Sequence, residues 1–296
     1  MARIVLSGAS GLIGKRLATG LTADGHRVLR LVRRASSGDN EISWDPAAGR
    51  LDAAKLASAD AVIHLSGEPI AGGRWSESRK KEIADSRLVS TRLLAETIAR
   101  GERKPVFLCA SAIGYYGDRG SEWLEEMSPR GSGFLAEVCA RWERACDPAR
   151  EGTRVVNLRL GVVLDRDEGM LAVLALPYKL GLGGRIGAGT QYASWITSHD
   201  VVAAVRHVLV SPALVGPVNL VAPAPVQNAE FSATLARVLR RPALLPVPAG
   251  LLRFALGEAA DEVLLASQRV RPAKLVATGF RFGDAQLEPA LRRLFE

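Results

Sequence analysis

The sequence predicts an α/β fold in which a doubly wound parallel sheet carries a smaller C-terminal α/β lobe. Three observations support this. Short apolar segments alternate with amphipathic segments over residues 1–165, a glycine-rich turn follows the first apolar segment, and the composition changes after residue 165. Alternation of strands with helices is typical of a parallel sheet that is covered by helices on both faces.

Six short segments have the composition of buried parallel strands, because they are apolar and rich in Val, Ile and Leu. They span residues 4–7, 27–32, 41–44, 61–65, 106–110 and 154–160. The clearest helix between them covers residues 76–100 and places Ile83, Leu88 and Ile98 on one stripe. That stripe is expected either to pack in the core or to form a dimer face, so the protein is expected to be a monomer or a homodimer.

The chain changes character after residue 165. Residues 180–189 are glycine-rich and cannot form a regular helix, and several prolines follow. Helices are predicted again at 228–240 and 284–295. The predicted domains are a dinucleotide-binding domain, 1–165 with parts of 195–225, and a partly interwoven substrate lobe, 166–296.

Composition narrows the class of protein. The apolar content of 48% is ample for a core, and no apolar run reaches the roughly 18 residues of a membrane span. The N-terminus lacks the pattern of a signal peptide. Cys109, Cys139 and Cys146 form no CxxC pair, and the four histidines lack metal-ligand spacing. We therefore expect a cytoplasmic protein with free thiols, no bound metal and no membrane partner.

The net charge of +8 is compatible with an anionic ligand or with nucleic acid. The cationic residues are spread along the chain rather than gathered in blocks, and no nucleic-acid motif accompanies them. No nucleic-acid partner is expected.

A glycine run follows the first predicted strand and opens the first helix. Gly8 permits a tight turn, Gly11 lets the backbone approach a pyrophosphate, and Gly14 lets helix and strand pack closely. The helix N-terminus then stabilises the phosphate charge. The residues predicted to contact a dinucleotide here are Gly8, Ser10, Gly11, Leu12, Ile13 and Gly14.

The end of the second predicted strand indicates which dinucleotide binds. NAD-binding folds carry an acidic residue about 20 positions after the glycines, where it binds the ribose 2′-hydroxyl. Here Arg33 and Arg34 stand in that region and no acid does. Because a guanidinium binds phosphate oxygens well, the sequence favours NADP(H) over NAD(H). The alternative is a solvated strand end, above all for Arg34.

The G-x-x-G-x-x-G spacing and the segment 60–67, DAVIHLSG, resemble extended short-chain dehydrogenases/reductases. Further motifs resemble their atypical epimerase-like branch, often described as sugar-nucleotide epimerases, which carries a C-terminal domain of unknown function. These motifs lie at 67–70, 74–75, 86–87, 111–117, 133–137, 142–143, 159–164, 180–184, 194–196, 228–231 and 279–282. The resemblance covers essentially the whole chain and implies a Rossmann-type domain.

The resemblance also implies additional cofactor residues along the strand ends. They are Val32 beside Arg33 at the 2′-phosphate, His64, Leu65, Ser66, Gly67 and Glu68 along the adenosine and ribose, Arg87 at a phosphate or ribose, Ser111, and Val162 near the nicotinamide. Leu65 and Val162 are alternatively core residues, and His64 a hydrogen-bonded strand histidine. Glu68 and Arg87 are alternatively a surface ion pair.

The catalytic pattern of the superfamily is missing. Short-chain dehydrogenases use Tyr-x-x-x-Lys with an upstream Ser or Thr, and the lysine lowers the tyrosine pKa for proton transfer. By resemblance, the tyrosine position falls at Phe134 or Leu135 and the lysine position at Val138 or Cys139. The hydroxyl position falls at Ala112.

Three side chains are candidate substitutes for the missing pair: Tyr115, Glu137 and Cys139. Tyr115 is the preferred proton donor because it offers a phenol in the loop after the fifth strand. The substrate is expected to meet Lys179, Arg185 and Gln191 over the C-terminal edge of the sheet.

Two functions remain open from the sequence. The first is an NADP(H)-dependent epimerase or oxidoreductase that acts on a small polar substrate such as a nucleotide sugar. The second is an NADP(H)-binding redox sensor or regulatory protein without turnover. The missing catalytic pair favours the second, whereas the intact cofactor motifs and the substrate lobe favour the first.

Overall fold

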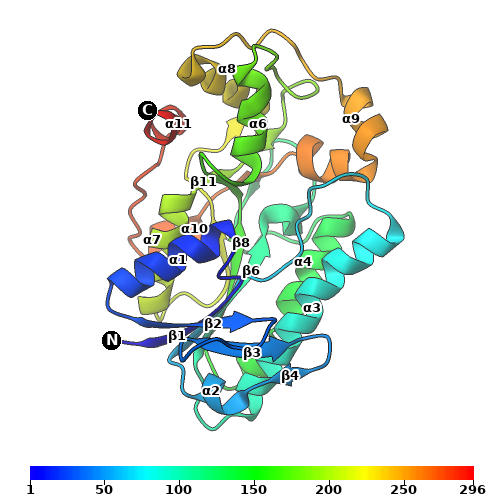
Figure 1. The fold of residues 1–296 in the computed structure, drawn as a ribbon. Helices are drawn as coiled ribbons and strands as arrows, with labels where there is room; N and C mark the ends of the chain where they lie inside the picture. Colours follow the sequence, from blue (N-terminus) through cyan, green and yellow to red (C-terminus); the bar gives the residue numbers. More distant parts are fainter.

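An eight-stranded sheet forms the centre of the computed structural model, which describes residues 1–296 (Figure 1). Its strands, in spatial order, are β12 (Gly216–Leu220), β8 (Val155–Leu160), β6 (Val106–Ala112), β5 (Ala61–His64), β1 (Arg3–Ser7), β2 (Arg27–Val32), β3 (Glu41–Asp45) and β4 (Arg50–Leu51). All neighbours pair in parallel except β3 and β4. The predicted doubly wound fold is therefore confirmed, and each predicted strand is present with its ends moved by at most two residues.

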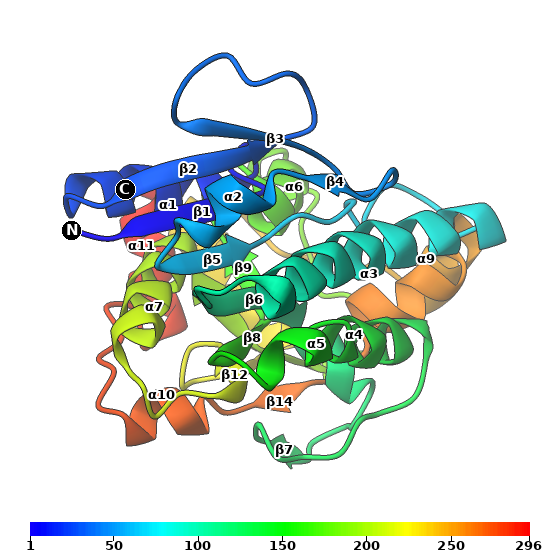
Figure 2. The same ribbon diagram turned by 90° about the horizontal axis from the view of Figure 1, so that it is seen from below.

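Helices cover both faces of the sheet (Figure 2). Helices α1 (Leu12–Ala23) and α7 (Ser198–Val210) lie on one face, and α2 (Ala53–Ala57), α3 (Glu77–Arg100), α4 (Phe134–Arg144) and α5 (Asp147–Arg150) belong to the other. None of the helices combines the length and the hydropathy needed to cross a membrane.

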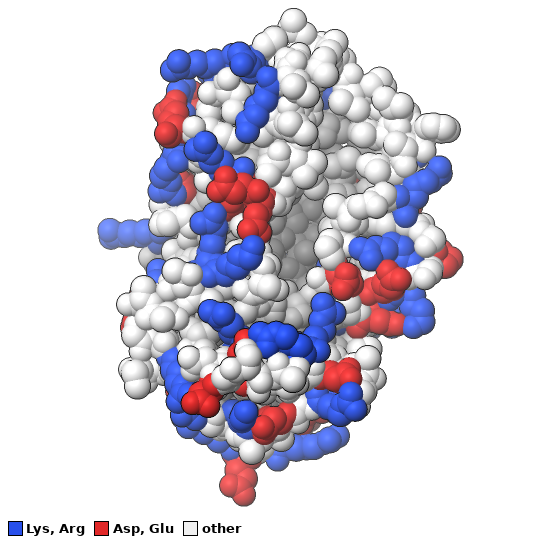
Figure 3. Space-filling model, in the orientation of Figure 1, with Lys and Arg blue, Asp and Glu red and all other residues white.

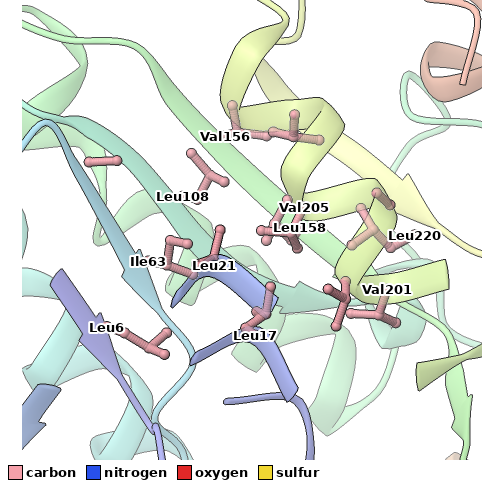
Figure 4. Packing of buried hydrophobic residues seen from close by; sticks show 14 of the residues in the cluster. Leu6, Leu17, Leu21, Ile63, Leu108, Val156, Leu158, Val201, Val205 and Leu220 are labelled. Carbon is pink, nitrogen blue, oxygen red and sulfur yellow. The ribbon is translucent and has the colours of Figure 1, made fainter. Parts of the chain in front are cut away.

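Alternate residues of β1 supply the cores on the two faces. Ile4 and Leu6 join the cluster on the α1 and α7 side, where Leu17 packs (Figure 4). Val5, which points the other way, joins the cluster that contains Leu94 of α3. Because side chains of a strand alternate between faces, a strand buried on both sides must be apolar throughout.

The remainder of the chain builds smaller elements, and all but one of them lie around the strand ends. They are η1 (Ile113–Tyr116), β7 (Trp123–Leu124), β9 (Val162–Leu164), α6 (Gly169–Lys179), β10 (Tyr192–Ala193), β11 (Trp195–Thr197), β13 (Val226–Gln227), α8 (Asn228–Leu239), α9 (Ala249–Leu256), the π-helix η2 (Ala260–Leu265), β14 (Arg269–Val270), α10 (Ala273–Ala277) and α11 (Leu287–Phe295). The exception is α10, which packs against β12 on the α1 and α7 face. The sequence predicted α8 closely, and it predicted α11 with three extra residues at its start. The domain boundary at residue 165 stays a prediction. Strand β12 is part of the large sheet and α7 packs against it, although both come after residue 165 in the chain.

His64, at the end of β5, is fully buried behind the sheet edge. Its Nδ1 lies 2.6 Å from the Ser7 hydroxyl and its Nε2 lies 3.1 Å from the Ser90 hydroxyl of α3. Burial lowers the pKa of His64 to about 3, so the ring stays neutral in the folded protein. Of the two roles considered for this histidine, the structure favours the hydrogen-bonded strand histidine.

This burial predicts a pH-dependent loss of stability. The pKa of His64 is about 3 when folded and near its ordinary value when unfolded, so the unfolded state binds more protons as pH falls from about 6.5 towards 3. Lowering the pH from 7.5 to 5 should cost about 2 kcal/mol of unfolding free energy through this group alone. Urea unfolding at both pH values should show this excess loss relative to His64→Asn, and parallel pH profiles would contradict it.

Candidate cofactor and active site

The glycine turn between β1 and α1 requires glycine at two positions. Gly8 has φ +68°, and a Cβ there would lie 2.9 Å from the carbonyl carbon of Leu65. A Cβ on Gly14 would lie 2.1 Å from the oxygen of Gly8. Gly11 caps α1 without a side-chain hydrogen bond, and the first turn holds no acid. The N-terminal amides of α1 are therefore free to bind an anion.

Two ion pairs join α1 to the segment that leads into α6. Lys15 lies 2.9 Å from Glu168, and Arg16 lies 2.5 Å from the buried carboxylate of Asp165. A Cβ added to Gly169 would lie 3.3 Å from the side chain of Leu12. Helix α6 thus begins directly against the residue that follows the glycine turn.

Arg33 extends into solvent at the end of β2. Its side chain is 80% exposed, and Nη1 stands 3.9 Å from Oε1 of Glu68. A cavity of about 520 Å³ adjoins it, lined by Arg33, Arg34, Ala35, Ser43, Trp44, Asp45, Gly49, Arg50, Leu51 and Asp52. Trp44 and Asp45 were not predicted from the sequence, although both lie at the end of β3, the strand that pairs with β2.

Arg34 has a different environment. Its guanidinium makes a two-pronged contact with the carboxylate of Glu41, with distances of 2.8 and 2.7 Å. The Arg34 hydrogen bond and the hydroxyl and amide of Ser37 lower the pKa of Glu41 to about 2. An incoming phosphate would have to compete with this carboxylate, so the structure favours Arg33 over Arg34 as the phosphate ligand.

Arg87 is a mostly buried cation on α3. Its Nη1 donates to the carbonyl of Ile83 at 2.9 Å, and its guanidinium lies 5.2 Å from the ring of Trp142. A Cβ added to Gly67 would lie 3.1 Å from Cζ of Arg87, so the guanidinium packs directly against Gly67. No carboxylate lies within ion-pair distance, and burial lowers the pKa of Arg87. It is not the surface ion pair that the sequence left open as an alternative.

The other predicted strand-end residues differ in what they offer a ligand. The backbone amides of Leu65 and Ser66 donate to the Ser7 hydroxyl at 3.1 and 3.4 Å. Val162 is half-buried, and its backbone amide donates to the carbonyl of Ser194. Ser111 is buried, and its hydroxyl donates to Glu143 at 2.8 Å. Like His64, Ser111 therefore supports the sheet edge through contacts with protein groups.

A buried ion pair lies beneath the loop that follows β6. Arg159 of β8 is 2% exposed and contacts both carboxylate oxygens of Glu143 at 2.7 and 2.8 Å. It also donates to the hydroxyl of Tyr116 at 3.0 Å. Burial alone would lower the pKa of Arg159, but the hydrogen bond and charge of Glu143 raise it above its ordinary value. The guanidinium is thus a permanent charge in the floor of this loop.

Tyr115 and Tyr116 lie differently against this cation. The half-buried Tyr115 ring stacks on the Arg159 guanidinium, with 3.5 Å from Cζ to the ring centroid. Tyr116 is fully buried and donates its hydroxyl to Asn219 at 2.7 Å, and burial raises its pKa to about 12. No hydrogen bond engages the Tyr115 hydroxyl within the protein, so of the two it is the phenol free to meet a substrate.

Helix α4 holds the other two candidate proton donors. Glu137 is half-exposed and pairs with Arg130 and Arg144. Cys139 is buried, and burial raises its pKa to about 12, so the thiol stays protonated. Cys139 is thus too buried to exchange a proton with a substrate, and the Glu137 carboxylate is engaged by two arginines.

A carboxylate from the C-terminal part of the chain caps α4. Glu262 of η2 accepts hydrogen bonds from the amides of Phe134 and Leu135, each at 2.6 Å. A carboxylate at a helix N-terminus satisfies free amides and interacts well with the helix dipole. This contact could not be predicted from the sequence, because it joins residues 128 positions apart.

The three predicted substrate residues differ in their contacts, and their role in binding a substrate stays a prediction. The side-chain amide nitrogen of Gln191 donates hydrogen bonds to the carbonyls of Ile186 and Leu264, at 3.1 and 3.2 Å. Lys179 and Arg185 are exposed and have no carboxylate partner. The amide nitrogen of Gln191 thus links the glycine-rich segment to η2.

His199, Asp200 and Asp284 lie close enough to suggest a metal site. However, Asp200 accepts the amides of Gly283 and Asp284 at 3.0 and 2.9 Å, and Arg293 pairs with Asp284. These hydrogen bonds use the carboxylates to anchor the C-terminal segment.

Comparison with known proteins agrees with this geometry. A family model described as "NAD dependent epimerase/dehydratase family" matches residues 4–220, and "Domain of unknown function (DUF1731)" matches residues 247–294. The chain is 43% identical to an epimerase family protein of Mycobacterium bovis, covering 97% of this chain and 96% of that protein. It is 35% identical to the human epimerase family protein SDR39U1, covering 99% of each.

Solved structures give the same result. The human SDR39U1 structure with NADPH matches with a TM-score of 0.88 and 33% identity, covering 99% of this chain and 98% of that one. A nucleoside-diphosphate sugar epimerase from Corynebacterium glutamicum matches with a TM-score of 0.83 and 35% identity, covering 99% of this chain and 58% of that one. With its glycine turn, its sheet order and these matches over nearly its whole length, the chain belongs to the NAD dependent epimerase/dehydratase family.

Proposed function

We propose that this protein binds NADP(H) and acts as an epimerase or oxidoreductase on a small organic substrate. The observation that carries the proposal is the uncapped N-terminus of α1 with the exposed cation of Arg33 at the neighbouring strand end. A pyrophosphate and a 2′-phosphate are the anions that suit these two features. The NADPH in the human relative supports the same preference.

Several residues of this chain would hold the cofactor. The first-turn amides of α1 would bind the pyrophosphate, and Arg33 would bind the 2′-phosphate. Arg87, which has no carboxylate partner, would supply a second cation to the phosphates or the ribose. The cofactor, when bound, supplies or accepts a hydride.

Tyr115 is the residue proposed to move the proton. Its hydroxyl is free of protein partners, and its ring stacks on Arg159, a cation that Glu143 fixes in place. The protein thereby holds a phenol in one orientation at the end of β6. Protonated Cys139 and the ion-paired Glu137 are poor alternatives.

A sensor without turnover is the second candidate. It is favoured by one observation: helix α4 has neither tyrosine nor lysine at the usual catalytic positions, and its N-terminal amides are taken by Glu262. The experiment on Tyr115 below separates the two functions.

Arg33→Ala should weaken NADPH binding by about 1.5–3 kcal/mol, the range for hydrogen bonds to charged groups. NADH binding should change little, because NADH lacks the 2′-phosphate. Arg34→Ala is the matched control, and it should have a much smaller effect because Glu41 already holds Arg34. Calorimetric titration of both cofactors measures this, and equal losses of NADPH and NADH affinity would contradict the role of Arg33.

Tyr115→Phe should lower turnover roughly 100-fold or more, the usual contribution of a positioned acid or base. The phenyl ring can still stack on Arg159, so NADPH affinity should not change. NADPH oxidation against a panel of carbonyl compounds and nucleotide sugars provides the measurement, with Tyr116→Phe as a comparison at a buried phenol. Undiminished turnover would remove Tyr115 as donor, and tight NADPH binding without turnover on any panel member would favour the sensor.

A further inference from the structure

A cluster of exposed leucines lies at the end of the molecule that holds α6, α8 and α9 (Figure 1). Its members belong to the segment after α6 and to the segment before α9, and each is at least half exposed: Leu180, Leu182, Leu244 and Leu245. The two segments run side by side, because the amide of Leu245 donates to the carbonyl of Gly183 at 3.2 Å. We refer to residues 179–185 and 240–247 together as the tip.

The chain around the tip is free of acidic residues. Neither the stretch 169–199 nor the stretch 231–257 contains an aspartate or a glutamate, although the whole chain has 31 of them. Of the lysines and arginines in these stretches, Arg237 and Arg253 are ion-paired. The others are exposed and have no carboxylate within ion-pair distance: Lys179, Arg185, Arg240 and Arg241. The tip therefore combines exposed leucines with free positive charge.

Part of this charge lies next to the leucines. Nε of Arg241, just beyond the end of α8, donates to the carbonyl of Lys179 at 3.3 Å, and Leu180 follows Lys179 in the chain. Figure 3 shows cationic side chains along the upper left of the molecule, over α8, beside a surface that is mostly uncharged across the top. The tip lies away from the proposed cofactor site, because α6 begins beside Leu12 and extends about 15 Å before it reaches Lys179.

The composition of the tip separates the surfaces that could cover it. A closed dimer would bring the same patch of two copies together, so that free cations would face one another with no carboxylate between them. Single-stranded nucleic acid stacks its bases on aromatic side chains, and the tip contains none. An anionic lipid surface offers phosphates to the cations and hydrocarbon to the leucines, so it is complementary to both.

We propose that the tip docks on the surface of an anionic lipid bilayer, with its leucines inserted at the boundary of headgroups and acyl chains and its cations on the lipid phosphates. Attachment of this kind combines a hydrophobic and an electrostatic contribution and needs no helix that spans the membrane. The proposal replaces the expectation of no membrane partner, which depended on the absence of a long apolar run. It is independent of the proposed function.

The test is a vesicle co-sedimentation titration of the full chain. Vesicles of equal parts phosphatidylcholine and phosphatidylglycerol are compared with vesicles of phosphatidylcholine alone. Binding to the anionic vesicles should be roughly tenfold stronger or more, because each cation near an anionic surface contributes about fivefold. It should weaken steeply as the salt concentration approaches about 1 M, since salt screens the surface charge.

Two double variants test the two contributions separately. Leu180→Ser with Leu244→Ser should weaken binding to the anionic vesicles about tenfold or more, because less apolar surface leaves water. Arg240→Gln with Arg241→Gln should weaken it about tenfold or more and should reduce its dependence on salt. Neither pair touches the proposed cofactor residues, so NADP⁺ affinity within about twofold of the parent, with an unchanged circular dichroism spectrum, shows that the variants are folded.

Matched controls lie far from the tip in the chain. Val210→Ser changes a side chain that is 79% exposed at the end of α7, and Arg100→Gln changes one that is 81% exposed at the end of α3. Both should leave vesicle binding unchanged.

Equal binding to the two kinds of vesicle, absence of binding to either, or unchanged binding in either double variant would each overturn the proposal. So would tighter binding to a short DNA duplex than to the anionic vesicles, or a dimer that the leucine variant dissociates in the absence of vesicle binding. Failure of NADP⁺ to bind the parent would contradict the proposed function, while the vesicle titration would still test the tip.

Discussion

The close approach of backbone to backbone at the glycine turn is the constraint on which the rest of the structure depends. Gly14 leaves no room for a side chain against Gly8, and Gly8 leaves none against Leu65. These contacts therefore fix the position of helix α1 relative to the ends of β1 and β5. The N-terminus of α1 has no side-chain cap, and α6 begins beside Leu12. The free amides of α1 and the starting position of α6 follow from the same few contacts.

The buried pair of Arg159 and Glu143 sets the geometry at the other end of the site. Removing two charges from water is costly, and the cost is offset only when their hydrogen bonds are satisfied. Here the guanidinium contacts Glu143, the Tyr116 hydroxyl and the carbonyl of Glu126, while Ser111 donates to the same carboxylate. The network links β6, β8 and α4, so it fixes the loop that carries Tyr115.

The sequence predicted those features that depend on local pattern. The strands were identified because they are apolar on both faces, and the glycine turn because its spacing follows from steric need. Arg33 was identified from its place at a strand end. Pairings with residues far along the chain or across a loop could not be predicted, since they depend on which side chains the fold brings together: Arg34 with Glu41, His64 with Ser90, and Gln191 with Leu264.

The contact between Glu262 and α4 gives this helix a structural role. In this chain α4 offers phenylalanine or leucine, and valine or cysteine, where the superfamily has tyrosine and lysine. Its first amides are bound by a carboxylate from η2, and its Glu143 holds Arg159. The helix thus joins the lobe to the sheet and fixes the floor of the site. The proposed proton donor therefore comes from a neighbouring segment, the loop after β6, where the Tyr115 ring stacks on Arg159.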